Sequence, residues 1–81
     1  MNERILDRIP IEDINPILEQ YSGITVHEAA VIYLRRDKRT YRGIQIELGN
    51  VPKKWIRSVL LKWEPWLIDI DTNYHKLPKQ Y

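Results

Sequence analysis

The chain has 81 residues, a length typical of one domain, and 43% of them are hydrophobic, which supplies one small core. It contains no cysteine, so disulfides and thiolate metal sites are excluded. No run approaches the roughly 20 apolar residues of a membrane span, and we expect no secretory leader. We therefore expect a cytoplasmic protein.

The net charge of +2 hides a strong segregation along the chain. Residues 1–34 carry two basic and six acidic side chains, a net charge of −4. Residues 35–62 carry nine basic and two acidic side chains, a net charge of +7. A basic block this dense repels itself unless a polyanion neutralises it, which indicates a nucleic-acid partner. A solvated basic face is the alternative that charge alone leaves open.

The first 23 residues predict a helical extension. Apolar spacing in residues 2–9 indicates one short helix that ends at Pro10, and Pro16, with Asn15 as N-cap, is expected to open a second. This acidic and apolar region suits packing, contacts within a homodimer, or a protein partner bound through the N-terminal helices. The apolar side chains offered for such contacts are Ile5, Leu6, Ile9, Ile17 and Leu18.

A capping box predicts the start of the next helix. The Thr25 hydroxyl can accept from the Glu28 amide while the Glu28 carboxylate reaches back to the Thr25 amide. The helix is expected to end in the basic run of residues 35–39, whose cations suit the negative end of the helix dipole. Five charged residues in a row exceed what a helix end requires, so phosphate contact stays open for part of this run.

Residues 40–63 predict two helices joined by a short turn. Thr40 is the expected N-cap of the first helix, and Gly49 follows it where the backbone is left-handed and glycine has no Cβ penalty. Pro52 has the fixed φ of a first helical position. The apolar residues expected on the inner face of the second helix are Ile56, Val59, Leu60 and Trp63.

The apolar period changes after Pro65. Residues 66–71 alternate apolar and polar, as a strand buried on one side does, and residues 74–77 suit a partner strand after a turn. We therefore expect a short β-hairpin after the last helix, and we expect Trp63 and Trp66 in the core.

Residues 40–60 have the sequence TYRGIQIELGNVPKKWIRSVL, which resembles the core of the winged helix-turn-helix superfamily. The superfamily's Ile, Leu-Gly, Val and Leu positions are taken by Ile44, Leu48, Gly49, Val51, Ile56 and Leu60. The resemblance covers residues 24–77 and implies a mainly α fold with a small β-hairpin, in which an extension at 1–23 precedes a winged helix-turn-helix domain at 24–81. Two departures stand out: Gln45 replaces a small residue, and the turn is one residue longer than the tightest form.

The resemblance and the basic block together predict double-stranded DNA binding, with the second helix of the motif in the major groove. The base-contact candidates are Lys53, Lys54, Arg57 and Ser58, which share the outer face near the start of that helix. Phosphate contacts are expected from Arg39, Thr40, Tyr41, Arg42 and Lys62. Wing contacts are expected from His75 and Lys76.

We expect a sequence-specific transcriptional regulator, associated with the nucleoid, that needs no cofactor or metal. An enzyme is not expected, because the two histidines stand in separate elements and no glycine-rich phosphate loop or Gly-x-Ser-x-Gly turn occurs. The alternative is a winged-helix accessory subunit that makes protein contacts in a replication or transcription complex and binds DNA non-specifically. The basic outer face favours the regulator.

Overall fold

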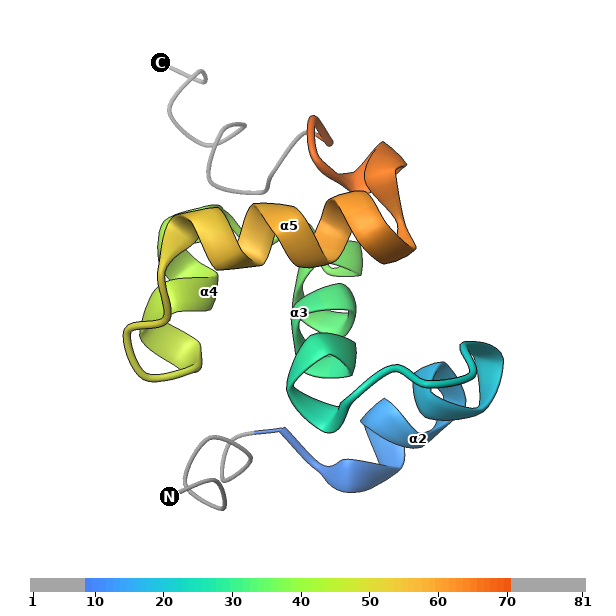
Figure 1. The fold of residues 1–81 in the computed structure, drawn as a ribbon. Coiled ribbons are helices and arrows are strands. Elements are labelled where there is room, and N and C mark those ends of the chain that lie inside the picture. The colour runs from blue at the N-terminus through green and yellow to red at the C-terminus, as the bar shows by residue number, and fades with distance from the viewer. Residues whose placement is uncertain (1–8, 71–81) are drawn as a thin grey trace.

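The computed structural model describes residues 9–70, which form four α-helices and a final 3-10 turn (Figure 1). In chain order these are α2 (Ile11–Gln20), α3 (Val26–Arg36), α4 (Tyr41–Glu47), α5 (Lys53–Trp63) and η2 (Pro65–Leu67). The central helix α3 contacts α2, α4 and α5, and η2 packs on α5. Among these residues no helix has the length and apolar character needed to cross a membrane.

All four helices contribute to one apolar core. Ile14 of α2, Ile32 of α3, Ile44 of α4 and Ile56 of α5 are each completely buried. Ile9 and Ile17, which the sequence offered as contacts for a second copy, also lie in this core. Leu18 is half-buried against the core, and residues 5 and 6 lie outside the described residues.

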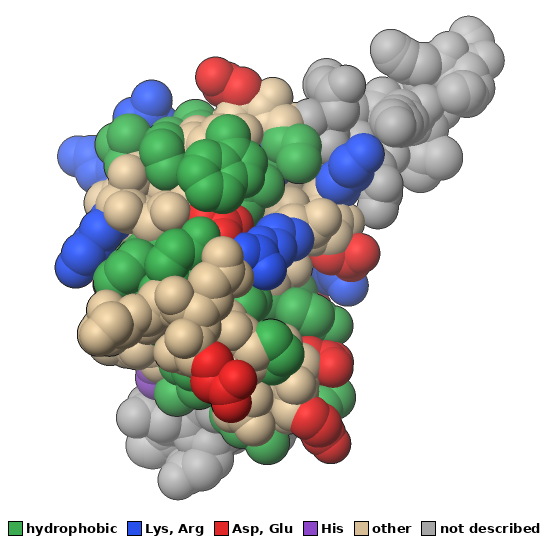
Figure 2. All heavy atoms as spheres, turned by 90° about the vertical axis from the view of Figure 1, so that its right-hand side faces the viewer, with side chains coloured by type: hydrophobic (Ala, Val, Ile, Leu, Met, Phe, Trp, Pro, Cys, Tyr) green, Lys and Arg blue, Asp and Glu red, His purple; other side chains and the backbone are tan. Residues whose placement is uncertain are grey.

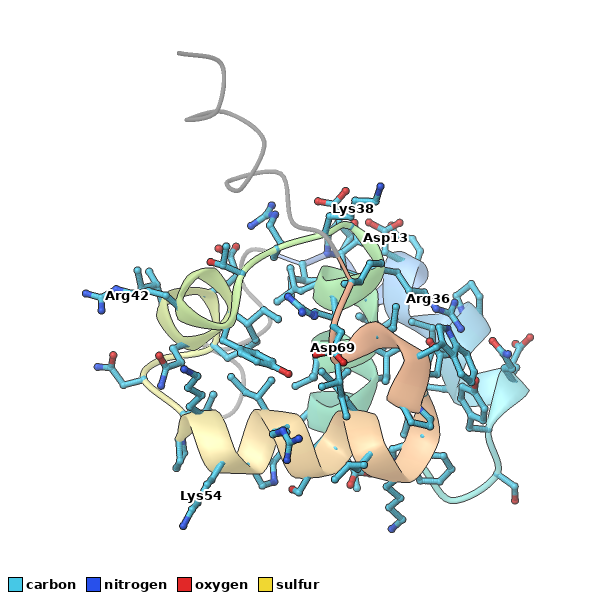
Figure 3. The ribbon with its side chains drawn as sticks, turned by 90° about the horizontal axis from the view of Figure 1, so that it is seen from above. Asp13, Arg36, Lys38, Arg42, Lys54 and Asp69 are labelled. Atoms are coloured by element: carbon cyan, nitrogen blue, oxygen red, sulfur yellow. The ribbon has the colours of Figure 1, made fainter. Side chains whose placement is uncertain are left out.

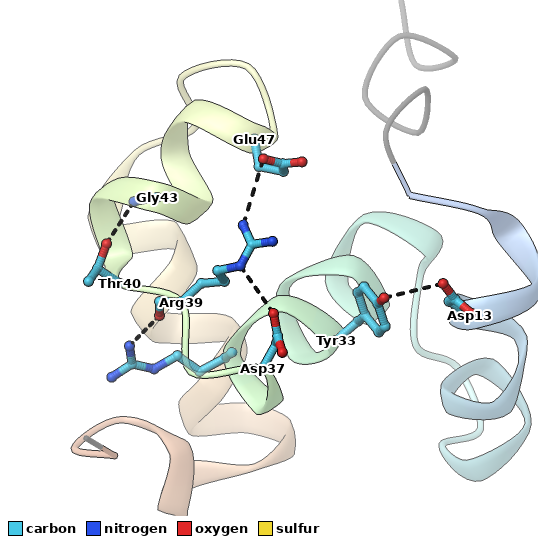
Figure 4. A network of polar contacts seen from close by, with 8 residues as sticks. Asp13, Tyr33, Asp37, Arg39, Thr40, Gly43 and Glu47 are labelled. Atoms are coloured by element: carbon cyan, nitrogen blue, oxygen red, sulfur yellow. Dashed lines mark hydrogen bonds and ion pairs between the residues drawn. The ribbon is translucent and has the colours of Figure 1, made fainter. Parts of the chain in front are cut away.

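The predicted helix starts at Thr25 and Thr40 are confirmed. Thr25 Oγ1 accepts from the Glu28 amide at 3.1 Å, and Glu28 Oε1 accepts from the Thr25 amide at 3.0 Å, which completes the capping box. Thr40 Oγ1 accepts from the Gly43 amide at 2.9 Å (Figure 4). The boundaries of α3 and α4 therefore follow from local side-chain chemistry.

The predicted helix start at Pro16 is wrong. α2 begins directly after Pro10, and Pro16 lies inside it. Proline in a helix interior loses one backbone hydrogen bond. Ile14 and Ile17 lie about one turn apart, and both are buried by the helix that contains Pro16. We infer that this burial outweighs the lost bond.

The predicted β-hairpin is also wrong for the residues that the structure describes, since none of residues 9–70 is in a strand. The chain after Glu64 instead forms η2, which buries Leu67. Residues 74–77, where the second strand was expected, lie outside the described residues. The alternating pattern therefore does not produce a wing here.

A buried arginine explains why the segment after η2 is not a strand. Arg35 of α3 is only 4% exposed, and its Nε and Nη2 donate to the carbonyls of Leu67 and Ile68 at 2.7 and 2.8 Å. Its Nη1 donates to the Arg39 carbonyl at 2.7 Å. In a strand these carbonyls would be directed at a neighbouring strand, whereas here both are directed at the guanidinium, which favours the turn. Burial lowers the pKa of Arg35 from its usual value.

The two tryptophans expected in the core differ. Trp63 is half-buried and packs against Tyr21, with ring centroids 5.4 Å apart. Trp66 is 66% exposed, so its predicted place in the core is wrong. The reason is the turn: η2 directs Leu67 inward instead of Trp66.

Candidate nucleic-acid interface

The turn between α4 and α5 is held by the side chain that departs from the superfamily pattern. The side-chain Nε2 of Gln45 donates to the Val51 backbone carbonyl at 3.0 Å. The backbone carbonyl of Gln45 accepts from the backbone amide of Asn50 at 2.6 Å. Gly49 and Asn50 are both left-handed, with φ of +84° and +70°. The large side chain at residue 45 therefore stabilises the longer turn, because the glutamine amide donates a hydrogen bond to a carbonyl of that turn.

Replacing Gln45 with alanine is expected to lower the free energy of unfolding by about 1 kcal/mol, the usual net value of one such hydrogen bond. Urea unfolding followed by tryptophan fluorescence measures the change. Gln20→Ala is the matched control, because it removes only an exposed contact with Arg36. Equal stability of the two variants would contradict this role for Gln45.

The helix α5 has a buried face and a basic exposed face. Ile56, Val59 and Leu60 fix it against the core. The residues of its exposed face are Lys53, Lys54, Arg57, Ser58, Leu61 and Lys62. All four base-contact candidates thus lie on the solvent side of one helix, and Lys54 projects outward near its start (Figure 3). Ser58 Oγ donates to the Trp55 carbonyl at 2.8 Å, which leaves its oxygen able to accept.

Tyr41 connects the starts of α4 and α5. Its ring lies 5.6 Å from Lys53 Nζ and 4.6 Å from the Arg35 guanidinium carbon. Its hydroxyl donates to the Ile68 carbonyl at 3.3 Å. Tyr41 therefore makes a cation–π contact with Lys53, and its expected contact with phosphate stays a prediction.

Much of the basic run of residues 35–39 serves the fold. Arg39 pairs with Asp37 at 3.1 Å and lies 3.9 Å from Glu47 (Figure 4). Arg36 pairs with Glu64, and Arg35 is buried among carbonyls. Apart from the buried Arg35, the cations without an acidic partner within residues 9–70 are Lys38, Arg42, Lys53, Lys54, Arg57 and Lys62. All of these except Lys38 lie on α4 and α5, which concentrates the unpaired positive charge there.

The far end of α5 is anchored by a buried carboxylate that the sequence analysis did not identify. Glu64 is completely buried and accepts from Arg36 Nε at 3.0 Å, from Arg36 Nη2 and from the Tyr21 hydroxyl. Burial would raise the pKa of Glu64, but the bonds from Arg36 and Tyr21 outweigh burial and lower it. The bond to Glu64 raises the pKa of Tyr21. The network joins α2, α3 and α5.

Charge is segregated in space as well as along the chain. Figure 2 shows acidic side chains over the lower part of one face, where α2 lies, and most Lys and Arg on its upper part, where other acidic side chains also lie. In Figure 3, Arg42 and Lys54 lie on the side opposite Asp13. The exposed acidic residues of α2 are Glu12, Asp13 and Glu19. A polyanion is therefore attracted to the α4–α5 side and repelled from α2.

Comparisons with protein families, curated proteins and solved structures found no match for this chain. In the part of the chain that the structure describes, no three His, Asp or Glu side chains are placed to hold a metal ion. The expected wing residues His75 and Lys76 lie outside the described residues. The functional argument therefore rests on the geometry and charge of α4 and α5.

Proposed function

We propose that the protein binds double-stranded DNA as a sequence-specific transcriptional regulator, with α5 in the major groove. One observation carries the proposal: α5 is fixed by buried residues on one face and presents basic residues without acidic partners, within residues 9–70, on the other. The major groove is about 12 Å wide and admits one helix. A rigid helix is needed because base contacts require a fixed register.

The exposed residues divide into two roles by position. Residues near the start of a recognition helix reach base edges, which assigns Lys53, Lys54, Arg57 and Ser58 to base contact. Arg57 is the strongest candidate, because a guanidinium pairs with guanine through two parallel hydrogen bonds. Arg42 on α4 and Lys62 near the end of α5 are assigned to phosphates, which set orientation without reading sequence.

The acidic surface of α2 favours one direction of approach. Like charge repels phosphate, so DNA that meets the α2 side gains no electrostatic attraction. The accessory-subunit alternative predicts a recognition face that is apolar or acidic, and the exposed face of α5 has four cations with Leu61 as its one large apolar residue. This composition favours DNA as the partner of α5.

Selection of bound sequences from random duplex DNA at physiological salt tests the proposal. The expected result is an enriched motif, with an affinity that falls as salt rises because phosphate contacts release counterions. Uniform weak binding would contradict sequence-specific regulation. An absence of binding at low salt would contradict DNA binding altogether.

A further inference from the structure

The outer face of α4 is an apolar surface with a basic rim. Ile46 is 59% exposed and lines two hollows of this face. Arg42 lies one turn before it on the same face and has no acidic partner within residues 9–70. Two open hollows flank this pair. They are lined by Thr40 and Gly43 on one side and by Gln45, Asn50, Val51 and Pro52 on the other.

The start of α2 is also apolar, but its charge is opposite to that of the α4 face. Ile11 is 46% exposed, and Glu12 next to it is exposed as well. Asp13 adds a second carboxylate, which accepts from the Tyr33 hydroxyl at 3.2 Å (Figure 4). An isoleucine beside carboxylates therefore stands on α2, and an isoleucine beside a guanidinium stands on α4.

We propose that copies of the chain associate head to tail, with the start of α2 in one copy seated on the outer face of α4 in the next. The charges select this arrangement over a two-fold one. In a two-fold contact the same face of both copies meets. Through α4, Arg42 of one copy would face Arg42 of the other, and through α2, Glu12 and Asp13 would face the same carboxylates, so like charges would repel. The head-to-tail contact instead pairs unlike charges and buries two exposed isoleucines.

The placement of the two faces permits this contact. Figure 3 shows Arg42 at the left edge of the molecule and Asp13 at its upper edge, beside Lys38, so the two faces point in different directions and one copy can bind two neighbours. Such heterologous contacts form rows. A contact this small is weak, so the association is expected only at high protein concentration. The association itself does not require DNA, so it can be tested independently of the proposed function.

Sedimentation velocity of the full chain without DNA, over a concentration series up to about 1 mM at low salt, tests the proposal. The weight-average mass of the wild type is expected to rise with concentration. Ile46→Gln and Ile11→Gln each remove one half of the contact and are each expected to remain monomeric. An equimolar mixture of the two variants retains one intact pair of faces, so it is expected to form dimers and nothing larger.

Two controls make the outcome decisive. Trp66→Gln removes the most exposed large apolar side chain outside both faces and is expected to associate like the wild type. Glu12→Lys disrupts the α2 face by charge alone, which covers the case that Ile11→Gln fails to fold. A monomeric wild type, continued association of the Ile46 variant, or a mixture that stays monomeric would each overturn the proposal.

Discussion

Arg57→Ala is expected to weaken binding to the selected duplex by about 1–3 kcal/mol, a loss of roughly 5- to 150-fold in affinity. Arg57 is exposed on α5, while its neighbour Ile56 is completely buried. The backbone at this position is therefore fixed against the core, and the guanidinium can reach a guanine edge in one register. Loss of this contact should also relax the sequence preference at one base pair.

Fluorescence anisotropy with the selected duplex and with a scrambled duplex separates the two effects. Lys38→Asn is the matched control, because it also removes one positive charge. Lys38 lies away from Lys54 in Figure 3, and asparagine tolerates its φ of +63°. The control is expected to weaken both duplexes slightly and equally. The assignment of Arg57 fails if its variant behaves like the control.

The sequence predicted α3, α4 and α5 because their signals are local. A capping box spans four residues, and a left-handed glycine is recognised from its place after a helix, so Thr25, Thr40 and Gly49 were identified correctly. The exposed face of α5 followed from the 3.6-residue period in the same way. These features need no knowledge of distant parts of the chain.

The features that sequence reasoning missed depend on contacts between distant residues. The bonds from Arg35 to Leu67 and Ile68 span 32 and 33 residues, and they replace the predicted strand with a turn. The Glu64 network spans 28 residues to Arg36 and 43 to Tyr21. A basic run at a helix end suggests solvent or phosphate, and nothing in its spacing shows that Arg35 is buried or that Arg36 pairs with a buried carboxylate. The number of basic residues in the run 35–39 is therefore larger than the number of cations that are free to bind a partner.

Glu64→Gln is expected to lower the free energy of unfolding by about 2–3 kcal/mol. Removing one partner of a buried ion pair is strongly destabilising, but the Arg36 side chain is 41% exposed and water partly compensates its lost partner. Because Glu64 joins α2, α3 and α5, the variant loosens the end of α5 as well as the whole domain. Urea unfolding at pH 7 measures the loss. Asp13→Asn, which alters only the exposed bond from Tyr33, is the control and should cost less than 1 kcal/mol.

The pH dependence of stability gives an independent measurement of the same carboxylate. The pKa of Glu64 is lower in the folded chain than its ordinary value of 4.5, so the unfolded chain takes up this proton first. The stabilisation is therefore complete above about pH 4.5 and declines as the pH falls through the lower folded pKa. Wild type should lose stability on acidification in this range more steeply than Glu64→Gln, which has no proton to gain at this position. Parallel curves for the two proteins would show that the ionised Glu64 does not stabilise the link between α2, α3 and α5.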